Sequence, residues 1–169
     1  MRVRRWVVAD THFGHERLVE WGYRPEGFTE LILKNCKEII KDEDLVIHLG
    51  DVAIPDGHGA VKHFMDQIPG RKILVMGNHD KRSVTWYMSH GFEFACKACE
   101  MGGVLFTHEP RVVVPEHIQF NIHGRLHEGN HREGGHGPKH RLVSMERSNY
   151  KPVRVEHMCR KPRKEKADG

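Results

Sequence analysis

Side chains that bind metal ions follow short apolar runs at several places in the sequence. Such a run is long enough for a buried strand, and the end of a strand holds the residues after it still. Their oxygen and nitrogen atoms, without a thiolate, favour Mn²⁺, Fe, Zn²⁺, Ni²⁺ or Co²⁺ over Ca²⁺. The pattern therefore indicates a metal site built from strand ends. The candidate ligands are Asp10 and His12 after 6–9, Asp51 after 45–49, Asn78 after 73–76, His108 after 104–107, and His127 in a fifth cluster at 123–127.

The spacing of these residues fits a pair of metal ions. Asp10 and His12 lie two residues apart, so on an extended backbone both side chains point the same way and can bind one ion. The Asp51 carboxylate has two oxygens and can place one on each of two ions. Two ions about 3.5–4 Å apart can bind the attacking and leaving oxygens of a phosphoryl transfer and lower the pKa of a bridging water. The expected nucleophile is a metal-bound hydroxide.

The residues after the third run predict the contacts with a substrate. His79 follows Asn78 directly, so it would face the substrate while Asn78 offers a carbonyl oxygen to a metal ion. An imidazole can bind a phosphate or protonate a leaving-group oxygen near neutral pH. Asp80 is the expected orienting acid. We therefore predict His79 and Asp80 as catalytic residues, with Asn78, His79 and Arg125 at the substrate phosphate.

In this order, the motifs resemble those of the calcineurin-like metallophosphoesterases, and stretches 10–15 and 121–124 look like the small single-domain bacterial and phage members. The resemblance covers residues 6–157 and implies an α/β fold, a two-sheet αββα sandwich with mixed parallel and antiparallel strands. It also implies two divalent transition metal ions, with Mn²⁺ as first candidate. By position, Asp10, His12, Asp51 and His127 would hold one ion, and Asp51, Asn78 and His108 the other. The motifs are Asp10-x-His12, Gly50-Asp51, Gly77-Asn78-His79-Asp80, His108 and Gly124-x-x-His127.

One position departs from the family pattern. The last motif of the family reads Gly-His-x-His, whereas this chain has Arg125 after Gly124. Arginine stays protonated and cannot be a ligand, so the second metal site should be weakened. Three interpretations compete: Arg125 turns outward or grips a substrate phosphate beside a weakly bound second ion, His123 replaces the missing ligand, or the site holds one ion and the enzyme is impaired.

The elements that must position these residues change in character along the chain. The first half predicts parallel strands with helical crossovers. The expected strands are 6–9, 45–49 and 73–76. The expected helices are 15–21, a helix capped by Thr29 and ending at Lys41, 60–68 after a turn at 55–57, and 83–90. Strands 92–101 and 104–107 flank the hairpin signal Gly102-Gly103. Strands 120–123, 141–145 and 152–155 follow without helices between them, so we expect the second half to be mostly antiparallel.

Length and charge fit one domain. The 169 residues are expected to form a single domain over 1–159 and a basic, disordered tail over 160–169, which holds part of the net charge of +4. The sequence has no apolar run near the ~20 residues needed to span a bilayer, and the first strand is too short for a signal peptide. We therefore expect a cytoplasmic protein with no membrane partner.

Several of the fifteen histidines lie outside the ligand motifs. His15 and His48 are expected to fix the loops around the site. His131, His136 and His140 lie in or beside a Gly-rich loop, where we expect them to be exposed. Whether the segment 129–140 is a lid or a plain loop is left open by the sequence.

The leading hypothesis is a metal-dependent phosphoesterase that hydrolyses phosphodiesters, phosphomonoesters or both. A chain of this length has little room for a cap domain, so the pocket should be open and suit a nucleotide or nucleic acid. One rival is a non-catalytic interaction scaffold of the same fold with an impaired metal site. A second rival is a nucleic-acid binder that relies on the basic tail.

Overall fold

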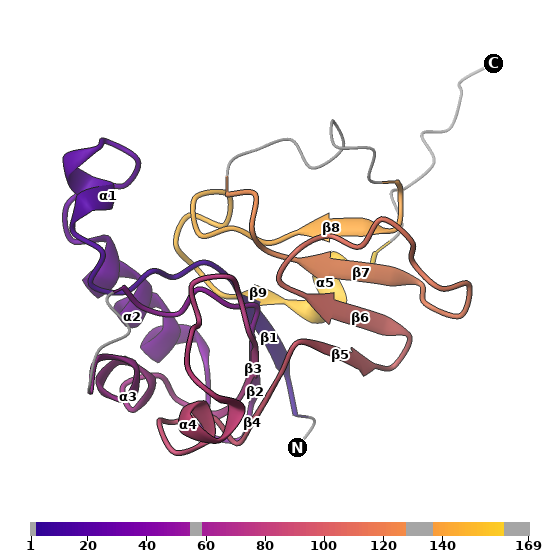
Figure 1. Cartoon of the computed structure of the whole chain (residues 1–169), viewed down its shortest axis with the longest axis horizontal. Helices are drawn as coiled ribbons and strands as arrows, with labels where there is room; N and C mark the ends of the chain where they lie inside the picture. Colours follow the sequence, from indigo (N-terminus) through magenta and orange to yellow (C-terminus); the bar gives the residue numbers. More distant parts are fainter. Residues whose placement is uncertain (1–2, 55–58, 128–136, 161–169) are drawn as a thin grey trace.

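The computed structural model describes residues 3–54, 59–127 and 137–160. In this part of the chain, two β-sheets lie face to face, with helices α1 to α4 on the outer side of the first sheet (Figure 1). The expected α/β sandwich of two mixed sheets is confirmed. The predicted turn at 55–57, most of the 129–140 loop, and the tail beyond Arg160 lie outside the described residues.

The first sheet has the strand order β4-β3-β2-β1-β9. Its strands β1 (Arg5–Val8), β2 (Leu45–His48), β3 (Arg71–Val75) and β4 (Phe94–Cys96) are parallel, and β9 (Val153–Arg154) is antiparallel to β1. The connections carry α1 (Arg17–Glu20), α2 (Phe28–Ile39), α3 (Ala60–Met65) and α4 (Val84–Met88). The predicted alternation of parallel strands and helices is therefore confirmed.

The two faces of the first sheet bury two separate cores, as the two-residue period of a strand requires. Trp6 and Val8 of β1 belong to the core under the helices, which also contains Ile32 of α2. Val7 belongs to the core between the sheets, together with Phe106 of the second sheet. Both sides of β1 are thus buried, which explains its continuous apolar sequence.

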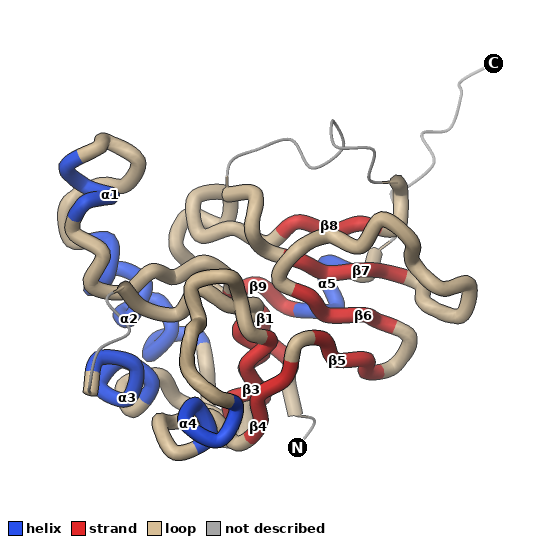
Figure 2. The backbone as a smooth tube through the Cα atoms, in the orientation of Figure 1, coloured by secondary structure: helices blue, strands red, loops and turns tan. Residues whose placement is uncertain are grey.

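The second sheet corrects the expectation of an antiparallel second half. It consists of β5 (Ala98–Met101), β6 (Val104–Thr107), β7 (Phe120–His123) and β8 (His140–Leu142), in that order (Figure 2). Only β5 and β6 are antiparallel, joined by the predicted turn at Gly102 and Gly103, whereas β6–β7 and β7–β8 are parallel. Parallel strands need long connections but not helical ones, and the 108–119 connection carries no helical pattern that would reveal the crossover.

Several predicted elements have different ends. The expected strand 92–101 is two strands, because the chain leaves the first sheet after β4 and enters the second at β5, with Lys97 between them. Strand 152–155 is shorter, and α5 (Val155–Met158) follows it directly. Helix α2 begins after Gly27, and Thr29 does not cap it, since its Oγ1 accepts a hydrogen bond from the Gly14 N–H at 3.3 Å.

The burial of His140 differs from the expectation. His140, expected to be exposed, is buried at 5 % exposure, and its Nε2 lies 2.7 Å from the Arg111 carbonyl oxygen. Among the described residues, no helix has the length and apolar character needed to cross a membrane.

Candidate metal centre

The predicted ligands come together at one edge of the sandwich. The carboxyl ends of parallel strands meet at the same sheet edge, which gathers the residues after β1, β2, β3, β6 and β7. Two groups of side chains, which share Asp10, each bring their ligand atoms within 4.8 Å of one another. One group is Asp10, His12 and His127, and the other is Asp10, Asp51 and His108.

Asp51 lies between the two groups. Its Oδ2 is 3.8 Å from Nε2 of His12 and 3.5 Å from Nε2 of His108. Its Oδ1 accepts a hydrogen bond of 2.8 Å from the backbone N–H of His79. One oxygen of the carboxylate thus faces imidazoles of both groups, whereas the expected arrangement had one oxygen for each ion.

The backbone around the site is strained. Five of the seven non-glycine residues with positive φ among the described residues belong to the site, and this conformation usually costs about 1–3 kcal/mol per residue. Gly124 lets β7 approach β1 closely, because a Cβ there would lie 2.5 Å from Asp10 Oδ2. Such strain is typical of functional sites, where surrounding contacts hold the side chains in place. The five residues are Asp10, His12, Asp51, Arg125 and His127.

Asp10 and His12 have the electrostatic properties of metal ligands. Asp10 is fully buried, and its Oδ1 has no hydrogen-bond partner among the described residues, while Oδ2 accepts from the Arg125 N–H at 2.8 Å. Burial raises the pKa of Asp10 to about 6, and burial together with the charge of Arg24 lowers the pKa of His12 to about 2. A divalent cation would partner the unpaired oxygen, and a neutral imidazole is the form that binds metal.

The surroundings of His108 point to a second cation. Its Nδ1 lies 2.7 Å from the Leu49 carbonyl oxygen, and its Nε2 lies 2.9 Å from Oδ1 of Asn78. Both neighbours are acceptors, whereas a neutral imidazole has one N–H to donate. With Nδ1–H donated to Leu49, the lone pair of Nε2 faces the Asn78 oxygen, and His108 and Asn78 would both offer a lone pair to a cation. The residues present therefore fit a divalent ion in each group.

Arg125 points into the site rather than outward. Its Nη1 donates a hydrogen bond of 2.9 Å to Oδ1 of Asn78, and its Nε lies 3.7 Å from Glu109 Oε1. The guanidinium thus binds the oxygen that we predicted for the second ion. His123, the proposed replacement ligand, is fully buried in β7 and belongs to neither ligand group of the described residues.

His79 and Asp80 differ in their placement. The exposed ring of His79 lies 5.6 Å from the ring of His12, centre to centre, so it borders the ligand cluster as expected. Asp80 is not placed as an orienting acid for His79. Its carboxylate accepts hydrogen bonds from the backbone N–H groups of Asp51, Val52 and Gly77 at 2.7–3.2 Å, which ties the loops after β2 and β3 together.

His48 fixes loops, as the sequence indicated. Its Nε2 donates to Thr11 Oγ1 at 2.9 Å, and its Nδ1 accepts from the Gly50 N–H at 3.1 Å. Complete burial lowers its pKa to about 3, so the ring is neutral at pH 7. His15 packs against His12, with the ring centres 5.7 Å apart. Neither His15 nor His48 belongs to a ligand group of the described residues.

Two residues of the site, Arg24 and Glu146, were missed by sequence reasoning. The buried Arg24 guanidinium donates to the carbonyl oxygens of Asp10 and Thr11, both at 2.7 Å, and its Nε donates to Glu146 at 2.8 Å. Glu146 also accepts from Nδ1 of His127 at 3.3 Å, which leaves Nε2 of His127 3.7 Å from Asp10 Oδ1. This arrangement orients a ligand imidazole through its second nitrogen.

The charges of this network depend on one another. Burial would raise the pKa of Glu146, but the hydrogen bond from His127 and the charge of Arg24 outweigh it and lower the pKa to about 2. The hydrogen bond to Glu146 raises the pKa of His127 against the effect of burial. Acidic and basic residues close together in the sequence would have indicated such a network. Arg24, however, lies in a turn that is more than 100 residues from His127 and Glu146 in the sequence.

Two sheets that carry Asp, His and Asn ligands at one edge define a metal-binding α/β sandwich. A sequence model described as calcineurin-like phosphoesterase matches residues 3–152. The chain therefore belongs to the calcineurin-like phosphoesterase family, and the resemblance seen in the motifs is confirmed.

The chain is also similar to a curated relative and to two solved structures. An uncharacterized protein of Methanocaldococcus jannaschii, MJ1445, is 28% identical over 163 residues, which cover 89% of this chain and 86% of the relative. The crystal structure of AQ665, a protein of unknown function from Aquifex aeolicus, matches with a TM-score of 0.72 and 26% identity over 93% of this chain and 98% of that one. Pseudomonas putida nuclease MPE matches in fold, with a TM-score of 0.51, 22% identity, and coverage of 73% and 62%.

Proposed function

We propose that this protein is a metal-dependent phosphoesterase that hydrolyses phosphodiesters and, more slowly, phosphomonoesters. The observation that carries the proposal is the position of Asp10, which belongs to both ligand groups and has a buried oxygen without a partner. We assign His12 and His127 to one divalent ion, Asn78 and His108 to the other, and both carboxylates between them, with Mn²⁺ as the first candidate. Bound ions of this kind activate a water and neutralise phosphoryl oxygens.

The protein's own residues orient the substrate and handle the proton. His79, exposed beside the ligand cluster, binds a phosphoryl oxygen or protonates the leaving-group oxygen. Arg125 exchanges its hydrogen bond with Asn78 for one to the substrate phosphate, which a guanidinium can bind through two N–H groups. Protonation by a general acid speeds hydrolysis most when the leaving group is poor. A histidine in this position therefore favours phosphodiesters as substrates.

Metal content and hydrolysis measured together test this function. We expect the chain to bind Mn²⁺ and to hydrolyse bis-p-nitrophenyl phosphate faster than p-nitrophenyl phosphate. Asp10→Asn should abolish hydrolysis and lower metal content. Asp66→Asn is the matched control, because Asp66 is exposed and pairs with Lys62 on α3. Bound metal without turnover of either ester would contradict the proposal.

The hydrogen bond between Arg125 and Asn78 favours a second candidate, a non-catalytic interaction scaffold. In this case the guanidinium replaces the second ion permanently, and the fold serves only to bind a partner. A scaffold would bind at most one Mn²⁺ per chain and would stay inactive in every ester assay.

A further inference from the structure

A cavity of about 310 Å³ lies beside two of the proposed ligands, Asn78 and His108. Its walls come from three segments: residues 76–78 and Asp80 after β3, Lys97 between β4 and β5, and residues 107–111, which begin at the last residue of β6. The volume is at the lower end of the roughly 300–1,000 Å³ range of small-molecule sites. A substrate bound at the metal centre would therefore have this cavity as a direct extension of its site.

Cationic side chains in this cavity are available to a ligand. Lys97 and Arg111 are exposed, and within the described ranges neither side chain has a hydrogen bond or an ion pair. Among the described residues, neither carboxylate of the lining pairs with these cations, because exposed Glu109 lies 3.7 Å from Arg125 and buried Asp80 accepts three backbone N–H bonds. The free charges are thus positive, and the chemistry that suits them is an anion.

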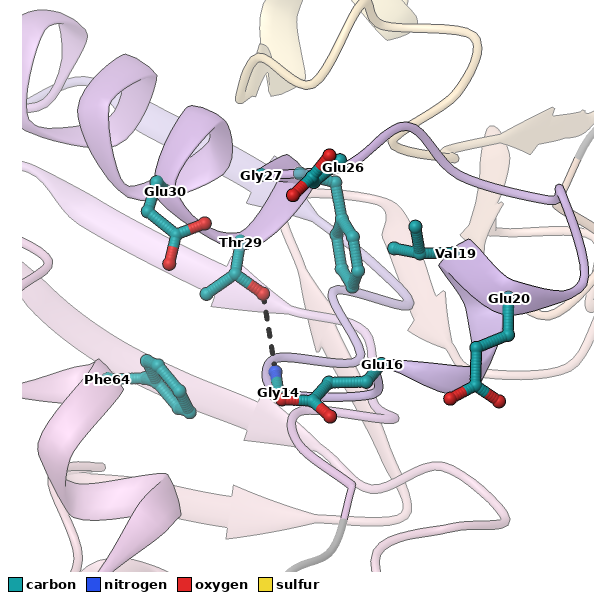
Figure 3. Close-up of a pocket in the computed structure, with 10 residues that line it drawn as sticks. Gly14, Glu16, Val19, Glu20, Glu26, Gly27, Thr29, Glu30 and Phe64 are labelled. Atoms are coloured by element: carbon teal, nitrogen blue, oxygen red, sulfur yellow. Dashed lines mark hydrogen bonds between the residues drawn. The ribbon is translucent and has the colours of Figure 1, made fainter.

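A second cavity, of about 440 Å³, has the opposite character. It lies at Gly14, on the loop that carries His12, and Figure 3 shows Glu26 and Glu30 on the two sides of Thr29 and Glu16 beside Gly14. Among the described residues, its lining includes no lysine or arginine, so it disfavours a phosphate. A substrate with more than one phosphate would extend toward Lys97 rather than toward Gly14. The four carboxylates of the second cavity are those of Glu16, Glu20, Glu26 and Glu30.

We propose that the cavity beside Asn78 and His108 is a subsite for a second phosphate group, bound by Lys97 and Arg111. The substrate class is a phosphodiester with a further phosphate on a neighbouring unit, as in a short oligonucleotide. This inference rests on the proposed function, because the first phosphate is the one at the metal centre. Lysine supplies a point charge and arginine a two-pronged contact, so the two side chains can bind one phosphate together.

Binding tests the subsite without turnover. The probes are thymidine 3′,5′-bisphosphate and thymidine 5′-monophosphate, titrated by calorimetry into the full chain with Mn²⁺. The bisphosphate should bind about tenfold more tightly, because a charge-assisted contact usually contributes about one factor of ten or more. In the double variant Lys97→Ala, Arg111→Ala this ratio should fall toward one. Lys34→Ala on α2 is the control, since Lys34 is exposed, pairs with Glu38 and is not among the described residues that line either cavity.

Hydrolysis separates this inference from the proposed function. Three dithymidylates are compared: one without a terminal phosphate, one with a 5′-phosphate and one with a 3′-phosphate. A preference of about tenfold for one terminal phosphate, lost in the double variant, supports the subsite. Equal turnover of all three dinucleotides and equal binding of both probes would overturn the subsite but leave the phosphoesterase intact. Tighter binding of the bisphosphate without any hydrolysis would support the subsite and contradict the phosphoesterase.

Discussion

Arg125 donates a hydrogen bond of 2.9 Å from Nη1 to Oδ1 of Asn78, the oxygen that also lies 2.9 Å from Nε2 of His108. A permanent positive charge therefore lies beside the side chains that we assign to the second ion. This contact argues against a side chain of Arg125 that turns outward, whereas phosphate binding and a one-ion site are separated by the metal titration below. We expect a second ion that binds Asn78 Oδ1 to displace this hydrogen bond.

The variant Arg125→His should strengthen the second metal site. Removal of the cation and addition of an imidazole should lower the Kd of the weaker Mn²⁺ by about tenfold or more. Calorimetric titration with Mn²⁺ measures both sites in one experiment. The control is Arg71→His, because Arg71 starts β3 at the far end from the ligands and pairs with exposed Glu93. An unchanged second Kd would show that Arg125 does not compete with the ion.

Glu146→Gln should weaken the first metal site and the fold together. The substitution leaves the buried Arg24 guanidinium without its countercharge, which usually costs about 3–5 kcal/mol of unfolding free energy. It also weakens the contact that orients His127, so Mn²⁺ affinity should fall about 10- to 100-fold. Urea unfolding and metal titration measure the two effects. Glu93→Gln breaks an exposed pair instead and should change the unfolding free energy by less than about 1 kcal/mol.

His79→Ala should reduce turnover without reducing metal content. If His79 protonates the leaving group, kcat should fall about 100-fold or more for a phenyl ester, whose leaving group is poor, and less for the p-nitrophenyl ester. Steady-state kinetics with both esters, together with metal analysis, tests this role. An equal loss for both esters would instead assign His79 to phosphate binding alone.

Acid should destabilise the protein through His48. Its pKa is lowered from 6.5 to about 3 by burial, so the unfolded state binds more protons between these values. Stability from this group is therefore present above about pH 6.5 and is lost as the pH falls toward 3. Between pH 7.5 and 5 the loss should be about 2 kcal/mol. Urea unfolding at both pH values, without metal, should show a smaller loss in His48→Gln; an equal loss would assign the acid sensitivity to other groups.

Local sequence predicted which side chains gather at the sheet edge, because the position of each depends on its neighbours alone. A buried strand needs a short apolar run, and the residue after it stands at a sheet edge whatever the rest of the chain does. The amino-acid sequence alone was therefore enough to place Asp10, Asp51 and His108 together. The helical spacing between the first strands likewise predicted parallel pairing in the first sheet.

Long-range contacts account for what the sequence did not reveal. Arg24 and Glu146 are 122 residues apart, and nothing in either neighbourhood indicates that they form a buried pair. The passage of the chain from one sheet to the other at Lys97 and the parallel pairing of β6, β7 and β8 depend on which strands pack together. The direction of Arg125 follows from the loop after β7, held by its N–H bond to Asp10. Residue types and spacing thus determined which side chains are candidate metal ligands. Packing between distant segments determined which charged residues, Arg24, Glu146 and Arg125, contact them.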